Sequence, residues 1–137
     1  MTHGAGPQAP GDVRWSDVVP VQVGGLRLQV PAALVTNGAA IDGPTAVFEG
    51  PGVTVVVDAG PFADRLDAHA GKPGFHEALV EVSGASGRRV SFSAPDAGTH
   101  TDALHVDGPR PFTVAVIAAP SVPDSVAADV LASVQLA

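Results

Sequence analysis

Side chains with metal-ligand chemistry follow one another in the middle of the sequence: Asp64, Asp67, His69 and His76, with Glu77 beside the last. Carboxylate and imidazole groups build zinc and other transition-metal sites. The spacing does not favour a metal, because the sequence contains neither a His-x-x-x-His pair nor His-Glu-x-x-His, which would fix two imidazoles on one helical turn. We interpret the cluster as a solvated acidic loop and expect no metal or cofactor. A small metal-binding protein or metal-dependent enzyme using these residues is the alternative.

Two histidines later in the chain raise a second possibility, nucleophilic catalysis. His100 and His105 flank Asp102, and on a strand His100 and Asp102 would share one face while His105 points to the other. A hydrolase of this type would need a serine in a Gly-x-Ser-x-Gly turn, and no serine stands in that pattern. We therefore expect His105 half-buried on a strand, His100 in a turn, and no enzymatic activity.

Charge and composition exclude several other functions. Acidic residues outnumber basic ones by 14 to 7, Lys72 is the only lysine, and Arg88–Arg89 is the only adjacent basic pair. Nucleic acids and anionic membrane surfaces require clustered basic residues, so neither is an expected partner. No apolar run approaches the ~20 residues of a membrane span. The absence of cysteine excludes disulfides, a thiolate nucleophile and Cys-ligated zinc.

The acidic balance favours a partner of the opposite charge. Residues 58–77 carry four carboxylates against Arg65 and Lys72, and residues 96–107 carry three with no lysine or arginine. We predict a protein or peptide partner with a basic face. The predicted binding residues are Asp96, Asp102 and Asp107. In the alternative interpretation these carboxylates only keep the domain soluble.

The elements that position these groups are predicted to be mainly strands, because valine far outnumbers leucine and branched side chains favour strands. Val18–Val23 and residues 26–30 both alternate, and the Gly-Gly pair between them predicts a two-residue hairpin turn. Pro20 has no N–H to donate, so the first strand should lie at a sheet edge.

Two later strands, 53–57 and 112–119, are apolar at nearly every position, which predicts central strands covered on both faces. Residues 45–49 should pair with the first of them across Gly50-Pro51-Gly52, and 61–70 should form a short helix. Strands are also predicted over 78–82, 90–93 and 102–106, with turns over 83–87 and 95–98.

The C-terminal segment predicts an amphipathic helix over 125–134. Ser121 is the expected N-cap, with Pro123 and Asp124 near the first turn. Trp15 is interpreted as a cap on the core, with a role as partner anchor as the alternative. The apolar stripe expected to pack on the sheet contains Val122, Val126, Val130, Leu131 and Val134.

The order of the segments "LRLQVPAAL", "VTVVV", "EVSGASGRRVSF", "HTDALHV" and "FTVAVIAAP" before the final helix resembles PsbP-like proteins. This α/β/α sandwich superfamily also contains the Ran-binding Mog-type proteins. In particular, "VSGASGRRVSFSAP" is similar to the family's hairpin before an aromatic strand, and "VLASVQL" to its closing motif. The resemblance covers about residues 18–137. It implies a binding or accessory module and no shared catalytic residues.

We therefore predict an α+β fold, a mostly antiparallel sheet of about six to eight strands with a C-terminal amphipathic helix packed on it. Residues 1–11 are expected to form a disordered arm, and 12–137 a single domain. The leading hypothesis is a non-enzymatic binding or accessory domain, and a structural subunit that dimerises through an edge strand is another. No signal peptide is visible, which favours the cytoplasm, or export if an N-terminal signal has been removed.

Overall fold

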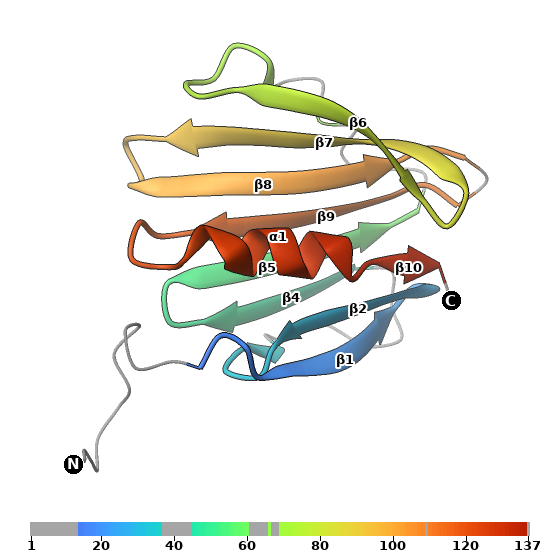
Figure 1. Ribbon diagram of the computed structural model, residues 1–137, viewed down its shortest axis with the longest axis horizontal. Coiled ribbons are helices and arrows are strands. Elements are labelled where there is room, and N and C mark those ends of the chain that lie inside the picture. The colour runs from blue at the N-terminus through green and yellow to red at the C-terminus, as the bar shows by residue number, and fades with distance from the viewer. Residues whose placement is uncertain (1–13, 37–44, 61–65, 67–68, 109, 137) are drawn as a thin grey trace.

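The computed structural model describes residues 14–36, 45–60, 66, 69–108 and 110–136, and within them it contains ten strands and one helix (Figure 1). The elements are β1 (Val18–Val23), β2 (Leu26–Pro31), β3 (Val35–Thr36), β4 (Thr45–Gly50), β5 (Val53–Ala59), β6 (His76–Val82), β7 (Ala85–Ala94), β8 (Thr99–Val106), β9 (Phe112–Ala118), α1 (Asp124–Ala132) and β10 (Gln135–Leu136). One antiparallel sheet has the order β3-β4-β5-β9-β8-β7-β6, and a second has the order β1-β2-β10. The predicted α+β class is confirmed.

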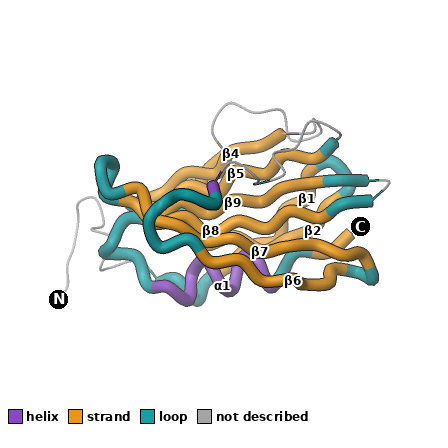
Figure 2. The backbone as a smooth tube through the Cα atoms, turned by 90° about the horizontal axis from the view of Figure 1, so that it is seen from above, coloured by secondary structure: helices purple, strands orange, loops and turns teal. Residues whose placement is uncertain are grey.

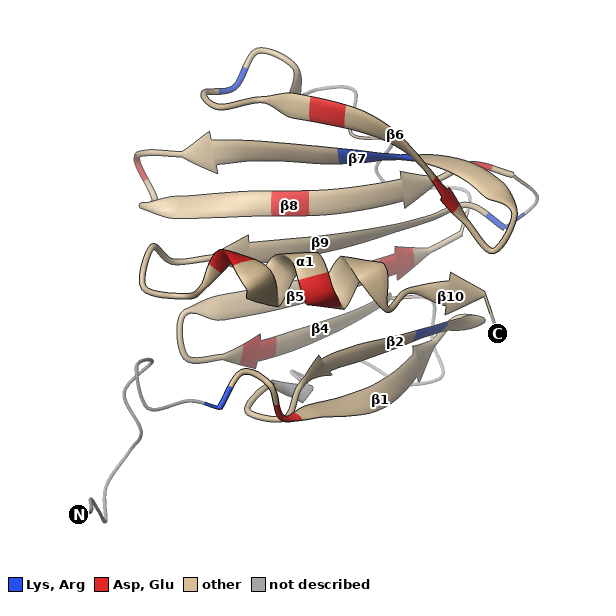
Figure 3. Cartoon of the chain, in the orientation of Figure 1, with Lys and Arg blue, Asp and Glu red and all other residues tan. Residues whose placement is uncertain are grey.

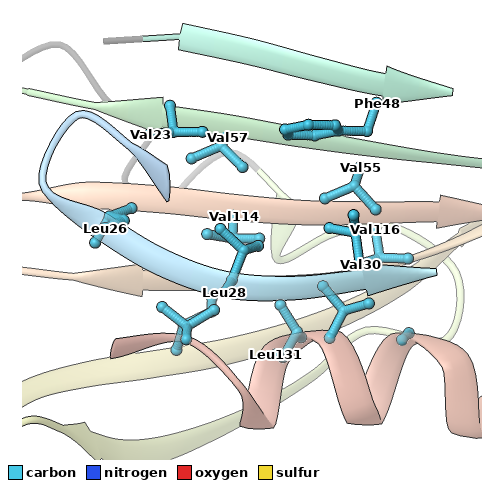
Figure 4. Close-up of a cluster of buried hydrophobic side chains, with 14 of the residues drawn as sticks. Val23, Leu26, Leu28, Val30, Phe48, Val55, Val57, Val114, Val116 and Leu131 are labelled. Carbon is cyan, nitrogen blue, oxygen red and sulfur yellow. The ribbon is translucent and has the colours of Figure 1, made fainter. Parts of the chain in front are cut away.

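The helix and the smaller sheet together cover one face of the seven-stranded sheet, and we name this the inner face (Figures 1 and 2). Alternate side chains of β5, β8 and β9 point to it and are buried against β2 and α1. Figure 4 shows Leu28 and Val30 of β2 and Leu131 of α1 meeting Val55 and Val114 of the large sheet. The opposite, outer face has a separate, smaller cluster formed by Leu66, Val90, Phe92 and Ala103.

The N-terminal hairpin has the predicted register and turn. Val23 pairs with Leu26, and Gly24 and Gly25 between them have φ of 54° and 88°, a conformation that glycine adopts without steric cost. Pro20 lies on β1, which is the edge strand of its sheet, as predicted. The hairpin is not part of the main sheet, however. Its apolar side packs on the inner face of that sheet, so the predicted single sheet is two sheets in contact.

The central strands are placed as predicted, with β5 between β4 and β9, and β9 between β5 and β8. The prediction that these strands are covered on both faces is only partly met, as β5 shows. Val53, Val55 and Val57 are buried on the inner face, whereas Val56 on the outer face stays partly exposed. The predicted short helix over 61–70 lies largely outside the described residues.

The β6–β7 turn is shorter than predicted. It consists of Ser83 and Gly84 alone, because β7 already begins at Ala85 and pairs with Val82. The Gly and Ser residues at 84–87 suggested a longer turn, but Gly87 is a strand residue pressed against β8. A Cβ built on it would lie 2.7 Å from the carbonyl oxygen of His105, so only glycine allows this approach.

The final helix, Asp124–Ala132, begins one residue earlier than the predicted 125–134 and ends two residues earlier. Its N-cap is Pro123, not Ser121, and no side chain caps it. Ser121 instead belongs to a preceding turn closed by a hydrogen bond from Val122 N to Ala119 O. The chain leaves the helix after Ala132 because β10 pairs with β2. The predicted stripe is confirmed, since Val122, Val126, Val130, Leu131 and Val134 are all buried.

Candidate functional site

The three predicted binding carboxylates do not form one patch. Asp96 is exposed in the turn before β8, Asp102 lies in the middle of β8 on the inner face, and Asp107 follows the other end of β8. Asp102 is engaged within the fold: its carboxylate oxygens lie 3.8 Å from Arg89 Nη2 and 3.5 Å from His100 Nε2. His100 and Asp102 therefore share a face as predicted, although His100 is in the strand and not in a turn.

His105 is more deeply placed than predicted, with only 2% of its surface exposed. It points to the outer face of β8. Its Nδ1 lies 2.8 Å from Thr113 Oγ1, and its Nε2 lies 3.0 Å from Asp107 Oδ1. A carboxylate only accepts hydrogen bonds, so Nε2 carries the proton and, in the neutral ring, Nδ1 accepts from the Thr113 hydroxyl. His105 is thus bonded through both ring nitrogens, to Thr113 on the neighbouring strand β9 and to Asp107 just after its own strand.

The residues of the metal hypothesis are only partly described, because Asp64 and Asp67 lie outside the described residues. His69 stacks on the ring of Phe92 on the outer face, with the two centroids 4.4 Å apart. His76 pairs with Ser91, the neighbour of Phe92 on β7, so its side chain belongs to the inner face. Within the described part of the chain, no three His, Asp or Glu side chains are grouped so that they could hold a metal ion.

Strand β6 is the most exposed regular element of the fold. It is one edge of the seven-stranded sheet, and no other described strand pairs with its free side. Five of its seven residues are exposed, and Leu79 keeps 87% of its surface accessible. Glu77, Leu79 and Glu81 share the outer face of this strand by alternation. Figure 3 shows acidic positions along β6 and basic positions on the neighbouring β7.

The two glutamates of β6 have different surroundings. Glu77 Oε2 accepts a hydrogen bond of 2.8 Å from Arg88 Nη1, on the paired strand β7. Glu81 pairs in register with Ser86, and the backbone N–H of Asp107 donates to the carbonyl of the same Ser86, at 3.3 Å. Glu81 and Asp107 therefore lie at one corner of the sheet. Two strand spacings separate them, which places their Cα atoms about 10 Å apart.

Sequence reasoning missed this edge. It treated β6 as an ordinary strand, because Ala78, Val80 and Val82 alternate with Leu79 and Glu81. The signal that could have found it is the triplet Glu-x-Leu-x-Glu, in which a leucine shares a face with two carboxylates. Trp15 is partly buried against the main core, which agrees with its interpretation as a cap.

Among the described residues, no helix has the length and apolar character needed to cross a membrane. The sequence matches no family model and no curated protein. Its structure is similar to the solution structure of cyanobacterial PsbP (CyanoP) from Synechocystis sp. PCC 6803, with a TM-score of 0.59. That similarity covers 100% of this chain and 98% of the cyanobacterial chain at 13% sequence identity. The fold is therefore PsbP-like, as the order of segments indicated.

Proposed function

We propose that this PsbP-like domain is a non-enzymatic accessory module that binds a protein partner by adding an extended basic segment to β6. The observation that carries the proposal is the exposure of this edge strand, with an apolar side chain, Leu79, left almost entirely in solvent. An edge strand presents unpaired backbone N–H and C=O groups, which are a template for an incoming strand.

The carboxylates on β6 favour a basic segment. On the outer face, an incoming strand would place its alternate side chains beside Glu77, Leu79 and Glu81. A cation, an apolar side chain and a second cation would complement that order, and the excess of 14 acidic over 7 basic residues would attract such a segment from a distance. Asp107 adds a carboxylate with 61% of its side chain exposed at the Glu81 corner.

A second copy of this chain complements the edge less well. If β6 paired antiparallel with itself around Leu79, Glu77 of each copy would face Glu81 of the other. Like charges directly opposite each other destabilise a strand pair. We therefore favour a basic partner over the predicted edge-strand dimer.

The absence of enzymatic activity remains part of the proposal, and it is supported by how three of the four described histidines are used; the fourth, His76, is exposed on β6. His105 is bonded to Thr113 and Asp107, His69 is stacked on Phe92, and His100 lies beside Asp102. Each of these imidazoles is engaged with neighbouring strands or loops of the fold.

The test uses a synthetic peptide of alternating lysine and valine, titrated into the isotope-labelled protein. We expect amide signals of β6 to shift, and the affinity to fall as the salt concentration rises. The double variant Glu81→Gln/Asp107→Asn should weaken binding several-fold. Asp96→Asn, which removes one carboxylate at the opposite end of β8, is the control and should have little effect.

Two outcomes would contradict the proposal. One is a set of shifts that avoids β6, or binding that is equally sensitive to Asp96→Asn and to the corner variant. The other is a dimeric mass in solution that becomes monomeric in Leu79→Lys, since a second copy would then occupy the edge. The parent and all variants should first show the same circular dichroism spectrum.

A further inference from the structure

The outer face of the large sheet contains a hollow of about 450 Å³, a volume within the range of small-molecule sites. Its floor lies on β5, β7, β8 and β9, and Leu66, His69 and Lys72 line it from the segment before β6. Two alanines, Ala103 and Ala115, face each other in register at the centre of the floor. Both side chains are single methyl groups; Ala103 is buried in the small outer cluster, and Ala115 stays partly exposed to the hollow.

The hollow is long, and it runs diagonally across the strands. One end is formed by Phe92, Ala94 and Thr99 on β7 and β8, and the other by Asp58 and Thr113 on β5 and β9. Asp58 on β5 is three strands away from β7, and in register it lies level with Arg88, four residues before Phe92. The usual spacing between strands and between residues along a strand then gives about 20 Å between the Cα atoms of Asp58 and Phe92. An extended molecule fits this shape better than a compact one.

The two ends of the hollow differ in charge. Lys72 is at the Phe92 end, where its Nζ lies 4.6 Å from the centre of the aromatic ring. At the other end, Asp58 Oδ1 accepts a hydrogen bond from Thr45 Oγ1, at 3.3 Å. Between these ends the lining is mainly apolar and includes Val56, Ala103 and Ile117.

The single lysine of the sequence is held in place by its loop. The backbone N–H of Lys72 donates to His69 O at 3.0 Å, and Phe75 N donates to Lys72 O at 3.2 Å. Ser93 N of β7 then donates to Pro73 O at 2.8 Å, which ties the loop to the sheet beside Phe92. The cation therefore stands at the mouth of an apolar hollow in a protein that is otherwise rich in carboxylates.

From this geometry we infer that the hollow binds an elongated organic acid, whose carboxylate pairs with Lys72 and whose apolar chain lies over Ala115, beside Val56 and Ile117. Charge complementarity sets the orientation, because Asp58 repels a carboxylate at the far end and Lys72 attracts one at the near end. Removal of the chain from water supplies the affinity. The site is on the outer face of the central strands and is distinct from the backbone edge proposed for the protein partner.

The experiment is a calorimetric or NMR titration of the purified protein with decanoate and with the uncharged decanol. We expect decanoate to bind more tightly than decanol and to shift amide signals around Ala103 and Ala115. Lys72→Met should weaken decanoate binding by about fivefold, the upper end for an exposed ion pair, and leave decanol unchanged. Arg27→Met, which removes a cation from β2 in the other layer, is its matched control.

A second variant fills the hollow. Ala115→Leu adds three carbons to the floor and should reduce the affinity of both ligands by at least about tenfold. The matched control is Ala97→Leu, which adds the same atoms in the exposed turn between β7 and β8. If Ala115→Leu does not fold by circular dichroism, Ala94→Leu, at the Phe92 end of the hollow, replaces it.

The inference is overturned if neither ligand binds, or if both bind equally and Lys72→Met changes nothing. It is also overturned if Ala115→Leu leaves binding intact in a folded protein. A parent that is dimeric in solution and becomes monomeric in Ala115→Leu would show that a second copy covers the outer face, and this would exclude the acid as the occupant.

Discussion

Replacing Thr113 by valine tests whether the hydrogen bond between Thr113 and the buried His105 stabilises the fold. Valine has nearly the same shape as threonine and fits a strand, but it has no hydroxyl. In the native protein Thr113 Oγ1 lies 2.8 Å from His105 Nδ1, and the imidazole is almost fully buried. The variant therefore leaves a ring nitrogen in the interior without the partner that it has in the native fold.

The size of the effect follows from that burial. A buried polar atom that loses its hydrogen-bond partner costs about 1–3 kcal/mol of the free energy of unfolding. For a chain of this length, that loss corresponds to a decrease of about 3 to 10 °C in the midpoint of thermal unfolding. The bond between His105 Nε2 and Asp107 does not offset the loss, since it is already present in the native protein.

The assay is thermal and urea unfolding followed by circular dichroism. Thr54→Val is the control, because Thr54 is partly exposed on β5 and its substitution should change the free energy of unfolding by less than about 0.5 kcal/mol. A double variant, His105→Leu/Thr113→Val, removes both bonding groups and should be more stable than the sum of the single changes predicts. A Thr113→Val protein as stable as Thr54→Val, or strictly additive effects in the double variant, would refute the argument.

Three further expectations follow from the same structure. Val130→Asp, in the buried stripe of α1, should lower the free energy of unfolding by several kcal/mol, because it places an unpaired charge in the core; a melt equal to that of the parent would contradict the packing of α1. Gly87→Ala should cost about 1–3 kcal/mol, since the new Cβ would press on the carbonyl of His105, and chemical denaturation would measure it. Elemental analysis of the dialysed protein should find no stoichiometric metal, and a metal lost from a His69→Ala/His76→Ala variant would disprove this.

Much of the fold was predictable because its information is local. Two strands of alternating residues joined by Gly24-Gly25 leave little choice but a hairpin, and the valine and leucine stripe of α1 has a single period. The same periodicity correctly separated His100 and Asp102 from His105 on β8. These features depend on residues within a few positions of each other, and such patterns are visible in one sequence.

Features that depend on distant residues were not predictable. The alternating residues of the N-terminal hairpin fit a strand pair inside the main sheet equally well. Only the packing of the hairpin against β5, β9 and α1 places it in a separate layer. Ser121 was the better N-cap by residue type, yet the turn that ends at Val122 makes Pro123 the N-cap, and α1 begins at Asp124. The carboxylates Asp96 and Asp107 are close in sequence but lie at opposite ends of β8, because the strand between them is extended.

The outer face shows why an apolar pattern does not by itself predict a filled core. Residues 53–57 are almost wholly apolar, and this was taken to mean coverage on both faces. The pattern shows which face of the strand is apolar, but it does not show how large the side chains of the neighbouring strands and loops are. The size of those side chains decides whether they fill the space above the strand. Across the inner face, Leu28, Val55 and Val114 interdigitate. On the outer face, Ala103 is buried in the small cluster with Phe92, but its partner Ala115 is only partly buried and borders the hollow. A hollow therefore forms where small residues are paired in register on neighbouring strands, and that pairing exists only after the sheet has formed.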